Sequence, residues 1–505
     1  MSINVLSTRH VFTKRGNLSM VAKLMRMKPK VPLLLVMLLC LQVMTGCTLF
    51  KREAEQDVQE NPAVVERYDG EMSKVIPSVY TAKKEFALVF NGMGDDVFMS
   101  QLLDALDKNK IEGTFFLPGV RVAEEPGIAR EIAARGYEIQ NNTLHRTDLA
   151  SISYDKIYKE VHRANEVIFK ETGHMPAYVA TGSGEYSDDI RLVAAQSGLD
   201  AVISYSLNLK KRHMETSEMI VDYVNKYMTR GGIIALNTEE VPQLLDAIPL
   251  IADIANKVGY QIVPLSKLIA DGGERKPLEE IAGYDAARIN ADYKNAKYTV
   301  FKQFSTNKKE IALTFDDWGT DFTVTKLLDT LKKYDVKATF FLRANGVERN
   351  PNLARAIYED GHDVANHTYS HPVITSLSAG EIQEEVVKAH QVITEAIQAQ
   401  PVMLFRPPTG AIDEETARTV AAAGYDKIAM YDVTTFDWDA ANTADDIVEV
   451  IMNKTEAGSI ILLHMLDGIH TLEALPIVIE KLHNKGYSFV KMSDLLDSKK
   501  IAELE

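Results

Sequence analysis

The chain of 505 residues contains one long segment twice. Residues 83–90 (KKEFALVF) match residues 308–315 (KKEIALTF), and TFFL at 114–117 recurs at 339–342, both at an offset of 225 residues. Later matches, such as Gly198 with Gly424, drift from this offset by only one or two residues. A nearly constant offset indicates a duplicated domain, and the period is far too long for a solenoid repeat. The chain should therefore fold as two similar units in tandem.

Each copy alternates short apolar runs with segments of helical spacing. In the second copy, strands are predicted at 311–315, 338–342, 362–365, 427–431 and 459–463, and helices at 323–333, 353–358 and 378–397. Strands that alternate with helices indicate parallel β–α–β units. Some six or seven units in about 190 residues predict an α/β fold with a small or incomplete β/α barrel, in which reactive groups lie on the loops after the strands.

Charge and cysteine content narrow the possible ligands. The chain has 71 acidic and 56 basic residues, a net charge of −15, which disfavours nucleic acid and other polyanions as partners. The two cysteines, Cys40 and Cys47, both lie near the N-terminus, which excludes a disulfide framework and a cysteine-rich zinc site.

The N-terminal sequence has the features of an export signal. A basic flank precedes an apolar run at 31–44, which is shorter than the roughly twenty residues that span a bilayer. We therefore predict a signal peptide over 1–46. The sequence VMTGC at 43–47 resembles a bacterial lipobox, which implies cleavage before Cys47 and lipid anchoring to the outer face of a bacterial membrane. The alternatives are a plain signal peptide or a short uncleaved anchor. Residues 47–80 are polar and acidic, and predict a flexible tether.

Five polar motifs follow the predicted strands of the second copy, in order. They are Asp316-Asp317, His367 with His371, Arg406 within RPPTG, Asp437-Trp438, and His464. Adjacent carboxylates repel each other unless a cation is near, and two histidines four residues apart can share a metal ion. Each motif alone also fits an ordinary structural role, such as an Asx turn, a surface histidine pair, a rigid turn or a half-buried histidine. Their common position after strands favours a shared site.

Together the motifs resemble those of the NodB-like polysaccharide deacetylases, carbohydrate esterase family four. That family's motifs read roughly T-F-D-D-G, H-[ST]-x-x-H, R-x-P-[YFW]-G, D-x-x-D-W and L-x-H. The resemblance covers about residues 308–495. It implies a deformed β/α barrel, with a catalytic domain at 306–496, that removes acetyl groups from a carbohydrate with the help of a metal ion.

The resemblance also implies a role for each matching residue. Asp317, His367 and His371 would bind the metal, and Asp316, paired with Arg406, would be the base that activates a metal-bound water. The N–H of Thr409 would hold the oxyanion, and His464, oriented by Asp437, would protonate the departing amine. Trp438, Pro408 and Leu462 would line the acetyl-binding side.

The same set is chemically sufficient without reference to a family. Three protein ligands leave an open metal position, as in catalytic zinc sites, and hydrolysis of an amide needs both a base and an acid. Two imidazoles and one carboxylate suit Zn²⁺ best and also accept Co²⁺, Ni²⁺ or Fe²⁺. His464 beside Asp437 should hold its proton nearer neutral pH.

Three positions depart from the family pattern. Trp318 stands where the first motif has glycine, so the turn is shifted or the cleft is narrowed. Thr409 replaces an aromatic residue that could stack on a sugar. Asp432 lies five residues before Asp437, which is longer than the family spacing, so only Asp437-Trp438 matches.

The first copy, at 81–272, lacks every one of these functional side chains. At the matching positions it has Asn91, Gly92, Asn142, Arg146, Thr181, Lys211-Arg212 and Asn237. Because glycine and arginine side chains do not supply ligands to a divalent ion, we predict a degenerate barrel without a catalytic metal. Residues 273–305 form a linker, in which the spacing of charged and tyrosine residues predicts a helix packed on the second domain.

The preferred function is an anchored deacetylase of peptidoglycan or another N-acetylglucosamine glycan. The first alternative is an esterase that removes O-acetyl groups from a polysaccharide with the same residues. The second is a glycan-binding lipoprotein in which both barrels are inert, an interpretation motivated by Trp318 and by the degenerate first copy.

Overall fold

The computed structural model describes residues 65–209, 213–239 and 241–496. The predicted signal peptide, Cys47, most of the tether, and Lys211 and Arg212 lie outside the described residues. Every helix in the described part of the chain lacks the combination of length and apolar character that a bilayer-spanning helix needs.

The first copy forms one sheet of nine strands. They are β1 (Lys74–Ile76), β2 (Glu85–Asn91), β3 (Thr114–Leu117), β4 (Glu138–Asn141), β5 (Tyr178–Ala180), β6 (Ala201–Ile203), β7 (Leu207–Leu209), β8 (Ile233–Asn237) and β9 (Gln261–Ile262). Their order is β1-β6-β5-β4-β3-β2-β8-β7, with β9 paired to β2. All these pairs are parallel.

The second copy repeats this arrangement strand for strand. It contains β10 (Thr299–Phe301), β11 (Glu310–Asp317), β12 (Thr339–Leu342), β13 (Asp363–Asn366), β14 (Leu404–Phe405), β15 (Lys427–Ala429), β16 (Val433–Thr434), β17 (Ile460–His464) and β18 (Ser488–Phe489). The order is β10-β15-β14-β13-β12-β11-β17-β16, with β18 paired to β11. Two tandem, incompletely closed β/α barrels of one topology confirm the predicted fold class.

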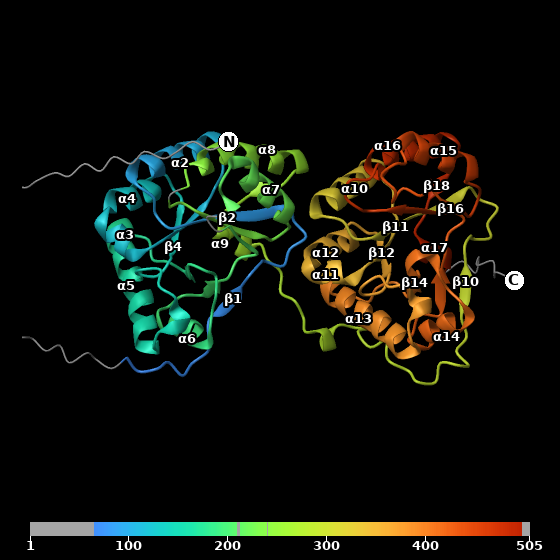
Figure 1. Ribbon diagram of the computed structural model, residues 1–505, viewed down its shortest axis with the longest axis horizontal. Helices are drawn as coiled ribbons and strands as arrows, with labels where there is room; N and C mark the ends of the chain where they lie inside the picture. Colours follow the sequence, from blue (N-terminus) through green and yellow to red (C-terminus); the bar gives the residue numbers. More distant parts are fainter. Residues whose placement is uncertain (1–64, 210–212, 240, 497–505) are drawn as a thin grey trace, which may run out of the picture. The chain divides into compact units, whose positions relative to one another are not determined.

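Helices follow the strands in both copies (Figure 1). The first copy has α2 (Asp96–Asn109), α3 (Gly119–Glu124), α4 (Pro126–Ala134), α5 (Tyr154–Thr172), α6 (Asp188–Gln196), α7 (Ser217–Tyr227), α8 (Gln243–Val258) and α9 (Leu265–Ala270). The second has α10 (Asp321–Lys333), α11 (Ala344–Arg349), α12 (Pro351–Glu359), α13 (Ala379–Ile397), α14 (Glu414–Ala422), α15 (Ala444–Lys454), α16 (Thr471–Asn484) and α17 (Met492–Leu496). Helix α13 begins at a capping box formed by Ser378 and Glu381.

The repeated apolar runs form repeated cores. The TFFL strands β3 and β12 are buried along their whole length. Phe315 stacks on Phe340 with ring centroids 5.1 Å apart, and in the first copy Phe90 stacks on Phe115 at 5.0 Å. Strands buried on both faces are typical of parallel sheets covered by helices.

The predicted helix in the linker is wrong. Between 273 and 298 the structure has one short 3₁₀ turn at Leu278–Glu280, followed by a turn that contains Gly283, whose φ is +82°. Thr299–Phe301 then forms strand β10, which pairs with β15. Strand β1 likewise pairs with β6, so each barrel begins before the predicted boundaries at 81 and 306. These short edge strands carry no helical or alternating pattern that the sequence could reveal.

Candidate functional site

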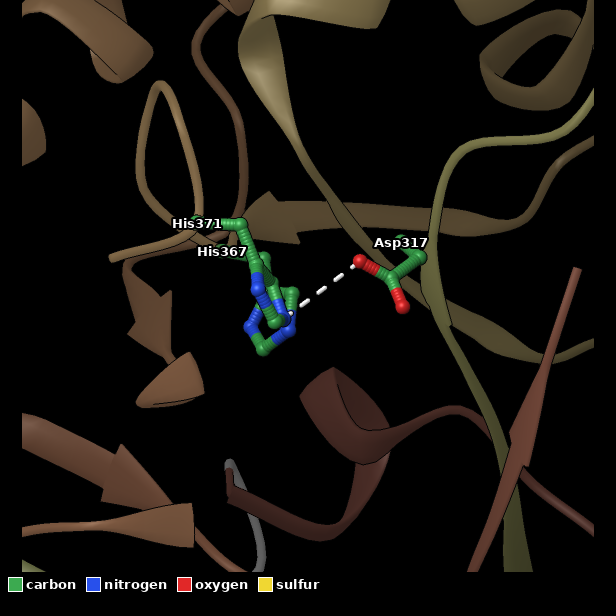
Figure 2. A group of neighbouring side chains, drawn as sticks. All are labelled: Asp317, His367 and His371. Atoms are coloured by element: carbon green, nitrogen blue, oxygen red, sulfur yellow. Dashed lines mark ion pairs between the residues drawn. The ribbon is translucent and has the colours of Figure 1, made fainter. Parts of the chain in front are cut away.

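Three predicted metal ligands converge at the carboxyl edge of the second sheet. Asp317 ends strand β11, whereas His367 and His371 lie on the loop after β13. One ligand atom from each lies within 4.8 Å of the other two. Figure 2 shows the carboxylate and the two imidazoles pointing toward one space from opposite sides, with His371 Nε2 3.4 Å from Asp317 Oδ1. Among the described residues, this is the one such group of three.

The end of strand β11 and the loop after β13, which carry the three ligand residues, contain residues in an uncommon backbone conformation. Asp317, Thr368 and His371 have φ values of +76°, +65° and +67°, which few residues other than glycine adopt. The Asn366 side chain accepts a hydrogen bond from the N–H of Thr368 at 2.9 Å and donates to the Val386 carbonyl at 2.9 Å. The N–H of His371 donates to Thr368 Oγ1 at 3.0 Å. Strain of this kind persists where surrounding contacts fix it, typically at functional sites.

His367 is prepared to act as a ligand through Nε2. The ring is buried, and Nδ1 donates a hydrogen bond to the Arg406 carbonyl at 2.7 Å. Burial lowers the pKa of His367, although Asp316 and Asp317 oppose this shift. The neutral ring therefore carries its proton on Nδ1, and the lone pair of Nε2 is available.

The three residues fit a divalent metal ion. Two imidazole nitrogens and one carboxylate oxygen form a donor set found in catalytic zinc sites, and such a site keeps a fourth position open. The hydrogen bond from His367 to a carbonyl supplies the outer contact that usually orients a ligating histidine.

Asp316 is paired with a fully buried arginine. Arg406 Nη1 lies 2.8 Å from Asp316 Oδ1. Arg406 also donates to Thr314 Oγ1 at 2.8 Å and to the Ala429 and Met430 carbonyls, both at 3.1 Å, and its guanidinium lies 4.0 Å from the ring centroid of Phe341. These contacts fix one oxygen of Asp316 and leave Oδ2 facing Nε2 of His367 at 3.8 Å.

His464 forms a second charged pair with Asp437. Nδ1 of His464 lies 2.9 Å from Asp437 Oδ1, and Asp437 Oδ2 accepts hydrogen bonds from the His464 N–H at 2.7 Å and the Thr471 hydroxyl at 2.6 Å. Burial by itself lowers the pKa of His464, but the hydrogen bond and charge of Asp437, together with the charges of Asp316 and Asp317, outweigh it and raise the pKa above its usual value. The ring can therefore carry a proton near neutral pH.

Asp316, His464 and the three ligand residues border one cavity of about 440 Å³, whereas their partners Arg406 and Asp437 lie behind its wall. Its lining consists of Asp316, Asp317, His367, His371, Pro407, Thr409, Gly410, Tyr431, Trp438, Leu462, His464 and Leu466. Trp438 is 43% exposed, and its ring centroid lies 5.1 Å from that of His464. The tertiary structure thus brings together residues from 316 to 466.

Three predicted site residues lie outside this lining. Arg406 and Asp437 are fully buried behind Asp316 and His464. Pro408, expected to touch substrate, is buried at the start of the turn Pro408–Gly410, and Pro407 lines the cavity instead. The turn is tight because Thr409 has a φ of +59°.

The departures from the family motifs have structural explanations. Trp318 packs against helix α11, where a Cβ on Gly346 would lie 2.3 Å from its ring, and it is not part of the cavity lining. The expected narrowing of the cleft by Trp318 is therefore wrong, which removes one reason for an inert second barrel. Asp432 accepts hydrogen bonds from Ser459 Oγ and the Ile460 N–H, whereas the partner of the His464 ring is Asp437.

Sequence reasoning missed Tyr431, Leu466, Thr471 and Asn366. Tyr431 follows strand β15, a position that the strand-end rule could have pointed to. Thr471 lies 34 residues from Asp437, and no local pattern links the two.

The first copy keeps the loop scaffold of this site. Thr143 and Arg146 have φ values of +63° and +57°. Asn141 accepts from the N–H of Thr143 at 2.6 Å and donates to the Val161 carbonyl at 2.9 Å. The N–H of Arg146 donates to Thr143 Oγ1 at 3.0 Å. Each of these bonds has its equivalent in the second copy.

An ion pair fills the place of the ligands in this copy. Arg146 Nη1 lies 2.8 Å from Glu239 Oε2. A Cβ on Gly92, the counterpart of Asp317, would lie 2.8 Å from both Arg146 Nη1 and Glu239 Oε1. Asn142, the counterpart of His367, donates to the Ala180 carbonyl at 2.9 Å. A guanidinium thus supplies positive charge where the second copy gathers metal ligands.

Comparison with known proteins gives concordant matches. The polysaccharide deacetylase family profile matches residues 78–202 and 304–428, one segment in each copy. A peptidoglycan-N-acetylglucosamine deacetylase of Bacillus cereus is 35% identical over 198 residues, which are 38% of this chain and 70% of that protein. The peptidoglycan-N-acetylmuramic acid deacetylase PdaC of Bacillus subtilis is 35% identical over 197 residues, 39% of this chain and 41% of PdaC. The solved structure of the peptidoglycan N-acetylglucosamine deacetylase Bc1960 is 34% identical and covers 41% of this chain and 96% of that one, with a TM-score of 0.38.

Proposed function

The chain belongs to the polysaccharide deacetylase family, and on this basis we propose that its second barrel hydrolyses acetamido groups of peptidoglycan or a related N-acetylglucosamine glycan. The observation that carries the proposal is the convergence on one cavity of three side chains suited to bind a metal, of Asp316, which is held by buried Arg406, and of His464, which is held by buried Asp437. Relatives named for N-acetylglucosamine and for N-acetylmuramic acid support a cell-wall substrate.

Asp317, His367 and His371 would hold the metal ion. When bound, a divalent ion polarises the acetyl carbonyl and makes a water molecule more acidic, and Zn²⁺ matches this donor set best, with Co²⁺, Ni²⁺ or Fe²⁺ also acceptable.

Asp316 is suited to be the general base. Arg406 fixes one of its oxygens by a hydrogen bond, so the other oxygen can accept a proton from the water that attacks the acetyl carbon. The N–H of Thr409, at the cavity wall, would donate to the oxyanion that develops.

His464 is suited to be the general acid. Asp437 fixes the proton on Nδ1, so the protonated ring can donate from Nε2 to the amide nitrogen as the C–N bond breaks. The products are acetate and a free amine on the sugar. Trp438 and Leu462 would enclose the acetyl group.

We further propose that the protein acts outside the cell, tethered through a lipid on Cys47. This part rests on the basic flank, the apolar run and the lipobox-like sequence at 43–47. A cell-wall glycan would then lie within reach of the tether.

Acetate release from defined oligosaccharides tests the proposal. We expect release from N-acetylglucosamine oligomers that depends on added Zn²⁺ and is abolished by a chelator. Asp317→Ala and His371→Ala should lower the rate about 100-fold or more, because each removes a ligand. Asn142→Ala, at the position matching His367 in the first copy, is the control and should be active. Equal release from all four proteins would refute the enzymatic proposal, and release from O-acetylated substrates alone would favour the esterase.

A further inference from the structure

Tyr431 borders the active-site cavity and has no role in the proposed mechanism so far. It follows strand β15 and lines the cavity beside Thr409 and Gly410. The ring is half-buried against the core that contains Phe341 and Ala429. A Cβ on Gly410 would lie 3.0 Å from the Tyr431 hydroxyl oxygen, so the hydroxyl lies against the turn that presents the N–H of Thr409.

The arginine that holds the base also fixes Tyr431. Arg406 donates to the carbonyls of Ala429 and Met430, the two residues before Tyr431. Its guanidinium lies 5.8 Å from the centroid of the Tyr431 ring. The position of the hydroxyl is therefore coupled to the same buried group that positions Asp316.

The duplication supplies an internal comparison. Tyr205 is the counterpart of Tyr431, because Gly198 matches Gly424 and each tyrosine follows seven residues later. The Tyr205 hydroxyl donates to Asn91 Oδ1 at 3.0 Å, and Asn91 is the counterpart of Asp316. In the second copy Arg406 bonds Asp316, and the described residues offer the Tyr431 hydroxyl no hydrogen-bond acceptor of their own. The tyrosine hydroxyl thus donates a hydrogen bond within the protein in the first barrel, and is available to donate one to a ligand in the second.

The Tyr431 hydroxyl is a donor at neutral pH. Burial raises the pKa of Tyr431, the charge of Arg406 opposes this by a smaller amount, and the charge of Asp316 adds to the rise. The phenol therefore keeps its proton across the range in which an enzyme of this kind would work.

We propose that Tyr431 is a further catalytic residue, whose hydroxyl donates a hydrogen bond to the oxygen of the acetyl group beside the N–H of Thr409. This rests on the proposed deacetylase function. When water adds, the carbonyl π electrons move onto that oxygen, and they return when the C–N bond breaks and acetate leaves. A donor placed at this oxygen stabilises the charge at the point where it is greatest.

Tyr431→Phe removes only the hydroxyl. On an N-acetylglucosamine oligomer we expect kcat to fall about 100-fold, the typical effect of losing one oxyanion donor, with KM nearly unchanged. Thermal unfolding and bound metal should match the parent chain. Tyr205→Phe is the matched control and should leave kcat and KM unchanged, because Tyr205 lies in the degenerate barrel.

The outcomes separate this inference from the proposed function. A parent chain that releases no acetate from any acetylated glycan would refute both. An active parent chain with an equally active Tyr431→Phe variant would refute the role of Tyr431 alone. A rise in KM at constant kcat would also refute it, since that result would place the hydroxyl on a sugar group and not on the acetyl oxygen. Loss of metal from the variant would show a structural role and would equally overturn the inference.

Discussion

Asp437 accepts three hydrogen bonds, and two of them come from His464. The carboxylate accepts from Nδ1 and from the N–H of His464, and Thr471 occupies the remaining acceptor position on Oδ2. Because the carboxylate is fully buried, its charge acts on the imidazole with little screening by solvent. Asp437 thus fixes the orientation of the proposed acid and, together with the charges of Asp316 and Asp317, raises its pKa.

The alkaline limb of activity should depend on this pair. His464 is an acid only while it is protonated, and its pKa is raised, so kcat should fall as the pH rises through that pKa. Asp437→Asn removes the negative charge and so should lower the pKa of His464. We expect the alkaline limb to move to lower pH, with kcat reduced about 100-fold at its maximum. The pH profile of kcat measures this.

Asp432→Asn provides the control for charge alone. Asp432 lies five residues before Asp437 and bonds Ser459 and Ile460. Its neutralisation should therefore leave the alkaline limb of the kcat profile at the same pH. An unmoved limb in Asp437→Asn would contradict the assignment of His464 as the acid.

At the scale of elements, the loop after β13 and the loop after β4 have the same construction. Asn366 and Asn141 each bridge their loop to the helix that follows, α13 or α5, through equivalent hydrogen bonds. The backbone geometry of the loop therefore does not depend on the proposed metal ligands, because the asparagine and threonine hold it in both copies. The residue at the last position, His371 or Arg146, then determines whether the loop presents an imidazole or a guanidinium.

Asn366→Ala should loosen this loop and weaken metal binding. Loss of the two hydrogen bonds should raise the metal dissociation constant about 10-fold or more, the usual effect of removing a residue that orients ligands. Competition with a chromophoric chelator measures it. Asn141→Ala is the matched control in the first barrel: it should lower the unfolding temperature to a similar extent and leave metal affinity unchanged. Unchanged affinity in Asn366→Ala would show that the ligands are oriented without this loop scaffold.

At the scale of the whole molecule, one topology serves two different sites. The nine strands of each sheet have the same order, yet only the second sheet gathers a set of three ligands among the described residues. In the first barrel the pair of Arg146 and Glu239 bridges the loops after β4 and β8. In the first barrel a paired arginine side chain occupies this edge, whereas in the second barrel we propose that a metal ion would occupy it.

The chain should therefore bind one metal ion. Elemental analysis after dialysis against Zn²⁺ should give one ion per chain for the parent and for Asn142→Ala, and none for Asp317→Ala. Calorimetry should show that chelation destabilises the second barrel only, by about 3 kcal/mol if the free metal had been at 100 times its dissociation constant. Two ions per chain, or an ion that survives Asp317→Ala, would contradict this picture.

The amino-acid sequence determined the duplication, the parallel fold and most of the site. Repeated apolar runs fix where strands lie, and parallel strands place their carboxyl ends on one edge, so motifs that follow strands must meet. This is why Asp316, Asp317, His367, His371 and His464 could be grouped from their order alone. The prediction of a helix in the linker was wrong for a related reason. The spacing of side chains does not reveal strand β10, whose three residues join the edge of the sheet through their backbone.

Only the tertiary structure decided the contacts between residues far apart in the chain. The hydroxyl of Thr471 on Asp437, the position of Tyr431 against Gly410, the packing of Trp318 outside the cavity, and the ion pair of Arg146 with Glu239 depend on how separate loops approach one another. Such approaches are set by the packing of whole elements, and no periodicity in the sequence encodes them. The sequence could therefore name the chemical groups of the site, whereas the fold determined which of them are paired, buried or open to a ligand.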